Sequence, residues 1–341
     1  MHKRDIVVMG ASYGGLAAYT SVLSMLPADI TAATFIVQHV TPDHKSALAE
    51  ILSRSGPLQA VQPADEERYR PGVIYTASPN RHLLVKNAHV RVVQGPRENG
   101  HRPSIDALFR SAAAAHTSRV IAVLLTGYRD DGVSGLDAVK RCGGTTIVQD
   151  PQEAQAPELP LNAVRRLQVD HILPLAGIAL KLAELVVLPA APAPPVPEDI
   201  MEGVKVSEHK VPNMDTLRKF ADPTPFTCPD CGGVLWNIRN ETVPHMRCVT
   251  GHAHSYDAYS AAQADVLENA LWAAIRFMEQ RIKLLTVMAD EARAQLGPLG
   301  AAVRAHSGRA DPECGRDPRL HRQRRPAKRQ VSLDPPVLLY V

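Results

Sequence analysis

The sequence predicts an α/β protein: a doubly wound, mostly parallel sheet with helices on both faces, followed by a small zinc-ribbon-like module and a long helix. Short β-branched runs alternate with helical stretches from about residue 5 to residue 187, and several runs are apolar throughout, as strands buried on both faces are. Three cysteines within residues 228–248 indicate the module. We expect five segments: a main domain (1–188), a proline-rich linker (189–215), the zinc-ribbon-like module (216–260), an amphipathic helix (261–296) and a basic, disordered tail (297–341).

The elements of the main domain follow the βαβ rhythm of a parallel sheet. We expect strands at residues 5–9, 34–40, 120–127 and 145–150, and helices at residues 14–26, 44–55, 105–116 and 133–142. Ser104 is a suitable N-cap for the third helix, and Gly143 and Gly144 end the fourth. Residues 73–77, 83–86 and 90–93 form strands without helices between them. We therefore expect a hairpin or an antiparallel edge there.

The bulk composition is that of an ordinary globular protein. The chain has 341 residues, of which 45% are hydrophobic and 21% charged, so it can bury a sizeable core and is long enough for two units. A net charge of +3, with basic residues concentrated near the C-terminus, predicts no nucleic-acid partner. The N-terminal apolar run ends at Gly10, which is too early for a signal peptide or a membrane span. We expect a cytoplasmic protein with no membrane insertion.

Residues 10–14, Gly-Ala-Ser-Tyr-Gly, match the G-x-S-x-G pattern between an expected strand and an expected helix. In that context the pattern forms a nucleophile elbow, in which a sharp turn presents the Ser12 hydroxyl. Backbone N–H groups at the start of the following helix can stabilise an oxyanion. The alternative is a glycine-rich turn that binds phosphate or only packs. Dinucleotide binding is disfavoured because the G-x-G-x-x-G spacing is not met.

Two other strand ends carry the base and the acid that a nucleophilic serine requires. His39 follows the run TFIVQ at residues 34–38, and Asp131 follows the strand at 120–127. The carboxyl ends of parallel strands share one edge of a sheet, so Ser12, His39 and Asp131 can converge there. The chain order serine, histidine, aspartate differs from that of α/β-hydrolases, which argues against that fold.

Several separated motifs carry a family resemblance. IVVMGASYGGLAA, IVQHVTPDHKSALAEIL, PGVIYTASPNRHLLV, HRPSIDALFRSAA and LLTGYRDDGVSGLDAVKRCGG occur in this order. Together they resemble the catalytic domain of chemotaxis protein-glutamate methylesterases of the CheB type, over about residues 4 to 187. The resemblance implies a carboxylic ester hydrolase that removes methyl groups from glutamyl methyl esters of chemoreceptors, and that can also act as a protein-glutamine glutaminase. It implies no cofactor for catalysis.

The resemblance also assigns roles to residues. Ser12 would be the nucleophile, His39 the general base and acid, and Asp131 the acid that fixes the His39 tautomer, with Asp130 a solvated turn residue. Many family members begin with a phosphoacceptor receiver domain, whereas here the first expected strand starts at residue 5. We therefore expect regulation by something other than a receiver domain in the same chain.

This sequence departs from the family pattern at two positions near the expected site. Tyr13 stands where threonine is common, and Tyr128 stands where methionine is frequent; both can reshape the substrate pocket. The segment of His101 and Arg102 lies close to the active-site face in the family. Arg102 is thus a candidate to attract an acidic receptor surface, with an ordinary loop role as the alternative. Four other histidines are expected at the surface or in loops: His44, His82, His89 and His116.

The cysteine-containing stretch predicts a structural zinc site. Cys228 and Cys231 form one knuckle-like pair, Cys248 and His252 form a second, and sixteen residues separate the two pairs. Four protein ligands leave no open position for water, so catalysis by this zinc is not expected. His254 or His245 could serve as the fourth ligand in place of His252. The alternative to a metal site is a set of free thiols in a small core. Because the linker begins with a proline-rich run (189–199), we expect the module to be independent of the main domain.

The helix after the module can carry a second function. We expect it to run from about Tyr256 to Ala294 and to break near Gly297 and Pro298. Trp272, Ile275 and Met278 can form an apolar stripe, which is more often a core or dimer seam than a ligand site, so self-association through this helix is possible. The alternative to a methylesterase is a catalytically weak regulatory or scaffold protein whose module and helix bind a partner.

Overall fold

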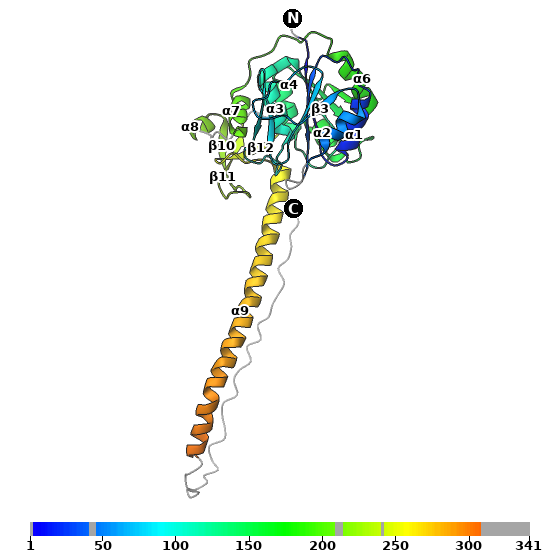
Figure 1. Ribbon diagram of the computed structural model, residues 1–341. Coiled ribbons are helices and arrows are strands. Elements are labelled where there is room, and N and C mark those ends of the chain that lie inside the picture. Colours follow the sequence, from blue (N-terminus) through cyan, green and yellow to red (C-terminus); the bar gives the residue numbers. More distant parts are fainter. Residues whose placement is uncertain (1–2, 41–45, 209–213, 240–241, 308–341) are drawn as a thin grey trace. The chain divides into compact units, whose positions relative to one another are not determined.

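The computed structural model describes residues 3–40, 46–208, 214–239 and 242–307, and a parallel sheet forms the core of its main domain (Figure 1). The sheet has seven strands in the order β3-β4-β2-β1-β7-β8-β9, and all neighbours pair in parallel. The strands are β1 (Ile6–Ala11), β2 (Ala33–Gln38), β3 (Gln59–Val61), β4 (Val73–Thr76), β7 (Val120–Leu124), β8 (Thr145–Gln149) and β9 (His171–Leu173). The predicted α/β fold is confirmed.

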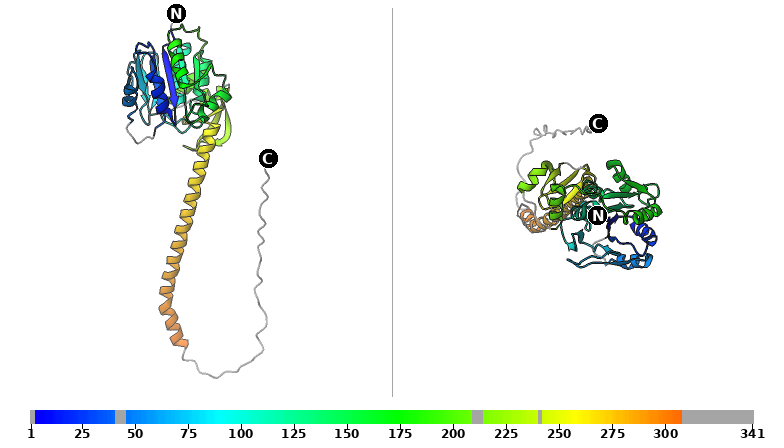
Figure 2. Two further views of the ribbon diagram at one scale, coloured as in Figure 1. Left: turned by 90° about the vertical axis from the view of Figure 1, so that its right-hand side faces the viewer. Right: turned by 90° about the horizontal axis from the view of Figure 1, so that it is seen from above.

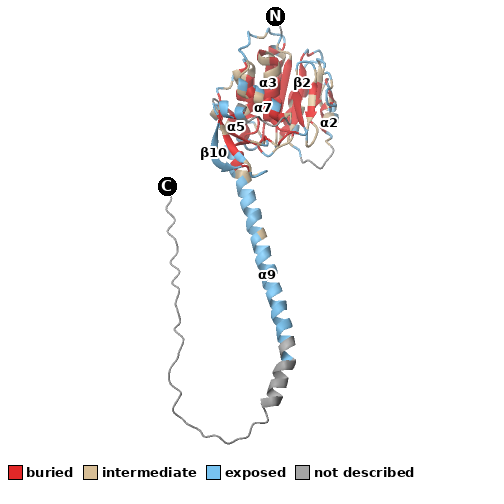
Figure 3. Ribbon diagram, turned by 90° about the vertical axis from the view of Figure 1, so that its left-hand side faces the viewer, coloured by how far each residue is buried: buried red, intermediate tan, exposed pale blue. Residues whose placement is uncertain are grey.

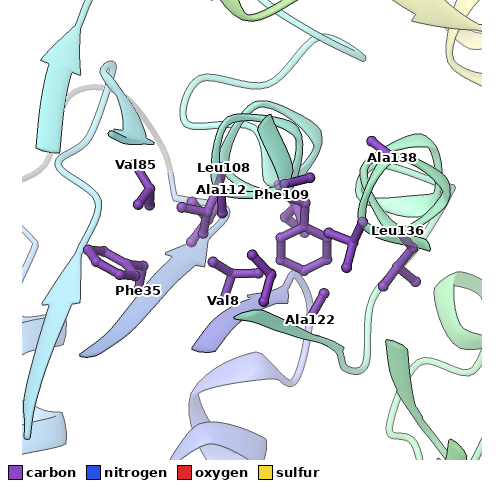
Figure 4. Close-up of a cluster of buried hydrophobic side chains, with 14 of the residues drawn as sticks. Val8, Phe35, Val85, Leu108, Phe109, Ala112, Ala122, Leu136 and Ala138 are labelled. Carbon is purple, nitrogen blue, oxygen red and sulfur yellow. The ribbon is translucent and has the colours of Figure 1, made fainter. Parts of the chain in front are cut away.

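Helices cover both faces of this sheet (Figure 2). One face packs against α1 (Gly15–Ser24), α2 (Leu48–Ser55) and α6 (Leu175–Leu185), the other against α3 (Ile105–His116), α4 (Val133–Arg141) and α5 (Glu158–Arg166). Side chains of α3 and α4 meet those of β1, β2 and β7 in the second layer (Figure 4). Val7 and Val8 of β1 belong to different core clusters because successive side chains of a strand point to opposite faces. This two-sided burial explains the continuous apolar strands.

Residues 73–77 were expected in a hairpin or antiparallel edge, and for β4 that expectation is wrong. β4 pairs in parallel with β2 and β3 inside the main sheet. Ile74 and Tyr75 are both buried, in opposite core layers, as is typical of a strand that is covered by helices on both faces. β5 (His82–Val85) and β6 (Val90–Val93) do form an antiparallel hairpin.

Part of the expected linker is helical. Residues 198–207 form α7 (Glu198–Ser207), which packs against α3. Ile200 and Val204 are buried one turn apart, and Asp199 accepts two hydrogen bonds from Arg141 of α4, each of 2.8 Å. An apolar spacing of four residues behind acidic residues in the first turn favours a helix over an extended linker. A second short helix, α8 (Met214–Phe220), follows.

The cysteine-containing module packs onto the main domain, so the expectation of independence is wrong. Its antiparallel sheet consists of β10 (Ala221–Thr227), β11 (Val234–Ile238), β12 (His245–Cys248) and β13 (Ala253–Ser255). Arg247 of β12 lies 3.6 Å from Glu98 of the main domain, which also accepts a hydrogen bond of 2.6 Å from Arg110 of α3. All three side chains are buried. A buried carboxylate between two guanidinium groups fixes the module to the domain because each charge requires its partners.

The last helix, α9 (Tyr256–Ser307), runs 52 residues and continues through Gly297 and Pro298, where a break was expected. Alanine and leucine on both sides of this pair favour the helix. The first residues of the expected tail are therefore helical, and residues 308–341 lie outside the described part. The chain divides into two compact units, Met1–Leu271 and Trp272–Val341, and the described side chains of α9 beyond its first turns are mostly exposed, as Figure 3 shows.

Among the described helices, none combines the length and the apolar character that crossing a membrane requires.

Glu98→Gln should destabilise the fold by about 3 kcal/mol at pH 7, because it leaves Arg110 and Arg247 without their buried carboxylate. Burial alone would raise the pKa of Glu98, but the two guanidinium groups lower it from 4.5 to about 2. A lowered carboxyl pKa stabilises the folded state above pH 4.5, and the stabilisation is lost as the pH falls towards 2. Urea unfolding should therefore show a large deficit at pH 7 and a smaller one at pH 3. Glu50→Gln, at an exposed pair with Arg54, is the control and should cost less than about 1 kcal/mol. A Glu98→Gln deficit that is equal at both pH values would contradict this account.

Candidate active site

Ser12 follows β1 directly and precedes α1, so the strand end and the helix start fix its position. Its backbone N–H donates to the Thr126 carbonyl at 3.0 Å, which ties the turn to the end of β7. Gly14 has φ +78°, a conformation that other residues rarely adopt, and a Cβ there would lie 2.7 Å from Gln155 Oε1. The glycine is therefore required for the turn and for the close approach of Gln155.

Ser12, His39 and Asp131 lie together at the carboxyl edge of the sheet. Ser12 Oγ is 3.2 Å from His39 Nδ1, and His39 Nε2 is 2.7 Å from Asp131 Oδ2. In the tautomer that satisfies both contacts, Nε2–H donates to Asp131 and Nδ1 accepts from the Ser12 hydroxyl. This arrangement can take a proton from the serine and hold the resulting imidazolium beside a carboxylate.

The Asp131 carboxylate is buried at the N-terminus of α3, where backbone N–H groups point towards it. It accepts hydrogen bonds from Ile105 N at 2.7 Å, from Ser104 Oγ at 2.8 Å and from Asn99 Nδ2 at 3.1 Å. Burial alone would raise the pKa of Asp131, but the hydrogen bond and charge of His39 and the Ile105 N–H lower it below its usual range. Asp131 therefore stays ionised at neutral pH.

A second buried aspartate, Asp106, lies in the first turn of α3 and binds the start of α4, whereas Asp131, just before α4, binds the start of α3. Asp106 accepts from Gly132 N at 2.9 Å and from Gly135 N at 2.6 Å, at the start of α4. Burial and the nearby charge of Asp131 raise the pKa of Asp106 well above its usual range. The two aspartates thus hold the starts of two helices against each other, and the turn that carries Asp131 is fixed from both sides.

His101 forms a wall of the site that sequence reasoning did not assign by itself. Its ring stacks on that of His39, with centroids 3.7 Å apart and an angle of 13° between the planes. Burial, with a further contribution from the charge of His39, lowers the pKa of His101 to about 4. His101 is therefore neutral at pH 7 and contacts the His39 ring without adding charge. The proximity of the segment to the expected site was the only signal in the sequence.

Ser12 lines a hollow of about 570 Å³, together with residues that include Tyr13, Gln38 and Gln155. Tyr128 is not among the lining residues, but its ring contacts that of Tyr13, with centroids 5.4 Å apart, and both side chains are about half exposed. Arg102 is not among the residues that line the hollow. It donates to Asn80 Oδ1 at 2.9 Å and to the Gly95 carbonyl at 2.7 Å, which is a loop-holding role.

Several residues expected in solvent are buried instead. Asp130 is 2% exposed and accepts hydrogen bonds from Ser255 Oγ at 2.8 Å and from Arg166 at 3.0 Å. His82 and His116 are also buried: His82 Nε2 lies 2.8 Å from the Pro96 carbonyl, and His116 Nε2 lies 2.8 Å from the Tyr69 hydroxyl. Their long-range partners explain these wrong expectations. His89 is half-buried beside Glu66, and His44 lies outside the described residues.

The donor atoms of Cys228, Cys231, Cys248 and His252 lie within 4.8 Å of one another, so this cluster can hold a metal ion. Cys231 Sγ is 3.7 Å from Cys248 Sγ, and Cys248 Sγ is 3.6 Å from His252 Nδ1. A tetrahedral zinc ion with Zn–S distances of about 2.3 Å separates two sulfurs by roughly 3.8 Å, so the donor set fits zinc.

The two alternative histidines lie differently. His254 Nε2 is 3.7 Å from Cys228 Sγ and 3.1 Å from Asp230, which gives a second possible donor group. His245 belongs to neither group among the described residues.

Comparisons with known proteins agree on the main domain. A family model described as CheB methylesterase matches residues 7–182. A candidate protein-glutamate methylesterase/protein-glutamine glutaminase of Leptospira interrogans is 35% identical over 176 residues, which are 51% of this chain and 91% of that protein. The protein-glutamate methylesterase/protein-glutamine glutaminase 2 of Xanthomonas campestris is 36% identical over 181 residues, 52% of this chain and 51% of that protein. The crystal structure of the Thermotoga maritima CheB methylesterase catalytic domain aligns with a TM-score of 0.51 and 33% identity, covering 53% of this chain and 98% of that one. The family match ends before the cysteine cluster.

Elemental analysis of the purified protein should find about one zinc per chain, because three thiolates and an imidazole at these separations form a closed tetrahedral set. Cys231→Ser, at the exposed cysteine of the set, should lower the zinc content several-fold. Cys142→Ser is the control, since Cys142 is buried in the main-domain core away from the cluster and should leave the metal content unchanged. Equal zinc content in all three proteins, or none in the parent, would contradict the site.

Proposed function

The chain belongs to the CheB methylesterase family, and we propose that it hydrolyses glutamyl methyl esters on a chemoreceptor-like protein in the cytoplasm through Ser12, His39 and Asp131. The observation that carries the proposal is the continuous chain of contacts from Ser12 Oγ through the two ring nitrogens of His39 to Asp131 Oδ2. A serine hydroxyl without such a base is a weak nucleophile at neutral pH.

In the acylation step, Ser12 Oγ attacks the ester carbonyl carbon while His39 Nδ1 accepts the hydroxyl proton. The carbonyl oxygen becomes an oxyanion beside the start of α1, where the N–H groups of Tyr13 and Gly14 are the candidate donors, helped by the helix dipole. The tetrahedral intermediate then collapses: its bond to the methoxy oxygen breaks, His39 returns the proton to that oxygen, and methanol leaves.

In the second step, His39 removes a proton from a water molecule, whose oxygen attacks the glutamyl-Ser12 ester. Collapse of this intermediate returns the proton to Ser12 Oγ and releases a glutamate side chain. Asp131 stays ionised throughout and stabilises the imidazolium through its 2.7 Å contact with Nε2. A glutamine side chain can follow the same steps with ammonia as the leaving group, which would account for a glutaminase activity.

The substrate is a side chain on a protein surface, because the hollow in front of Ser12 is open and wide rather than a closed small-molecule cavity. Tyr13 lines the hollow and Tyr128 packs beside it, and both half-exposed side chains are positioned to contact the residues that flank the modified glutamate. Arg102 is engaged by Asn80 and Gly95, so we propose no direct role for it in attracting an acidic receptor.

Ser12→Ala should reduce methanol release from a methylated chemoreceptor by about 10³-fold or more, since it removes the attacking oxygen and no core volume. Thermal unfolding should be nearly unchanged. The matched control is Ser24→Ala, at an exposed serine of α1 whose hydroxyl donates only within its own helix. Parent-like methanol release by Ser12→Ala would refute the serine mechanism and would favour the alternative of a regulatory protein.

A second function, self-association through α9, is favoured by the apolar side chains that this helix exposes. The large exposed ones include Leu267, Leu271, Ile275, Phe277, Met278, Ile282, Leu284, Leu285 and Met288. All of these except Phe277 and Leu284 recur at spacings of three and four residues. A solvated helix does not normally display so much apolar surface. We propose a second copy of the chain as the occupant, because Leu271, Met278 and Leu285 repeat every seven residues as in a coiled-coil seam.

Light scattering of the full-length protein should therefore give twice the chain mass or more. Met278→Glu combined with Leu285→Glu should shift the mass to that of a single chain, because charges at seam positions are desolvated in the assembly. Gln280→Glu, at an exposed polar position between them, should leave the assembly intact. A monomeric parent, or a double variant that assembles like the parent, would contradict self-association.

A further inference from the structure

One buried side chain, that of Asn99, connects the cysteine-containing module to the candidate active site. Asn99 is 3% exposed and lies in the tight turn formed by Glu98 to His101, with φ +52°. Its Oδ1 accepts a hydrogen bond of 2.9 Å from the backbone N–H of Ser255. Its Nδ2 donates to Asp131 Oδ1 at 3.1 Å and to Asp106 Oδ2 at 2.8 Å. Both ends of the amide are thus used, one by the module and one by the carboxylate that holds His39.

Backbone pairing reinforces this connection. The N–H of Asn99 donates to the Ala253 carbonyl at 2.7 Å, and the N–H of Ala253 donates to the Arg97 carbonyl at 3.2 Å. β13 therefore lies along the segment that carries Asn99 in the manner of an added strand, and Glu98 and Ala253 form a parallel bridge. The module cannot shift without moving this segment.

Ser255 makes a second connection, on the other side of Asp131. Its hydroxyl donates to Asp130 Oδ1 at 2.8 Å, so the module holds the residue that directly precedes Asp131. The side chain of Asp130 is itself oriented by Arg166 at 3.0 Å. Ser255 therefore contacts Asn99 through its backbone N–H and Asp130 through its hydroxyl, and these two residues flank the Asp131 carboxylate.

The same turn carries His101, whose ring stacks on His39. Glu98 anchors the turn because its carboxylate binds Arg110 of the main domain and Arg247 of the module. The positions of His101 and Asn99 therefore both depend on contacts with the module. This matters for hydrolysis because a displacement of about 1 Å in a catalytic group can cost 10²-fold in rate.

We propose that the cysteine-containing module completes the hydrolytic site, with Ser255 and Asn99 as positioning residues that hold Asp131 against His39. The inference rests on the proposed function and adds a role for residues beyond the region that the family match covers. A module that only stabilised the fold would need neither the amide bridge to Asp131 nor the hydroxyl contact with Asp130.

The test uses four full-length variants. Asn99→Gly removes the amide and keeps the backbone conformation, because glycine accepts a positive φ without strain. Ser255→Val removes the hydroxyl, and Ser255→Thr retains it at nearly the same volume. Thr224→Ala is the matched control, since its hydroxyl donates to the Leu235 carbonyl inside the module.

We expect Asn99→Gly and Ser255→Val to lower kcat for the methyl ester about 10-fold or more with little change in KM, and Ser255→Thr and Thr224→Ala to match the parent. A weaker Asp131 contact stabilises the imidazolium less, so the acidic limb of the kcat/KM profile should shift to lower pH in the two slow variants. The His39 Nε2 proton, observed by NMR, should also move upfield in them. The Ser255 hydroxyl accepts from Ala258 N as a helix cap as well, and loss of that cap alone would lower the melting temperature without moving either the pH profile or the NMR signal.

Two outcomes would overturn the inference. One is folded Asn99→Gly and Ser255→Val proteins with parent-like kcat and pH profile; the other is an unchanged His39 proton signal in both. The NMR measurement needs no turnover, so it decides the inference even if the parent shows no Ser12-dependent methanol release. That last result would instead remove the proposed function. If Asn99→Gly does not fold, the comparison of Ser255→Thr with Ser255→Val still decides, because equal rates in that pair would contradict a positioning role for the hydroxyl.

Discussion

The buried carboxylate of Asp131 is the constraint around which the site is arranged. An ionised carboxylate in the protein interior is costly unless donors surround it. Here the start of α3, Ser104, Asn99 and His39 supply those donors. Asp106 of α3 in turn holds the start of α4, so two helix termini and the turn between β7 and α4 satisfy one another. The position of Asp131 is therefore set by the same contacts that pack these helices on the sheet.

A second buried carboxylate explains why the C-terminal part of unit Met1–Leu271 cannot be regarded as an appendage. Glu98 is enclosed by a guanidinium from α3 and another from β12, and Ser207 of α7 donates to it at 2.7 Å. Charge pairing in the interior is worth little net stability but strongly disfavours separation of the partners. The module, α7 and the turn beside the active site therefore form one packed body within this unit.

The sequence allowed the main fold and the meeting of Ser12, His39 and Asp131 to be predicted, because the carboxyl ends of parallel strands share one edge whatever the details of packing. It did not reveal the burial of Asp130 or the docking of the module, because both involve the contact between Asp130 and Ser255, which are 125 residues apart in the chain. The ring orientation of His39, with Nδ1 towards Ser12, was equally out of reach, since it depends on side-chain rotation alone. The helix at residues 198–207 was not predicted because the prolines that precede it indicated an extended linker, although the helix itself has apolar residues at helical spacing. Local patterns indicated elements, and long-range polar contacts decided where those elements lie.

The cysteine cluster can influence the active site because only a short stretch of chain separates the two. His252 immediately precedes β13, and the Cys248 N–H donates to the His252 carbonyl at 2.9 Å. A loop closed by a bound ion at Cys248 and His252 would have little freedom, so the next residues would leave it in a fixed direction. Those residues are Ala253 to Ser255, which pair with Asn99 and reach Asp130. Backbone and two hydrogen-bonding side chains, those of Ser255 and Asn99, therefore connect the cysteine cluster to the Asp131 carboxylate that contacts His39.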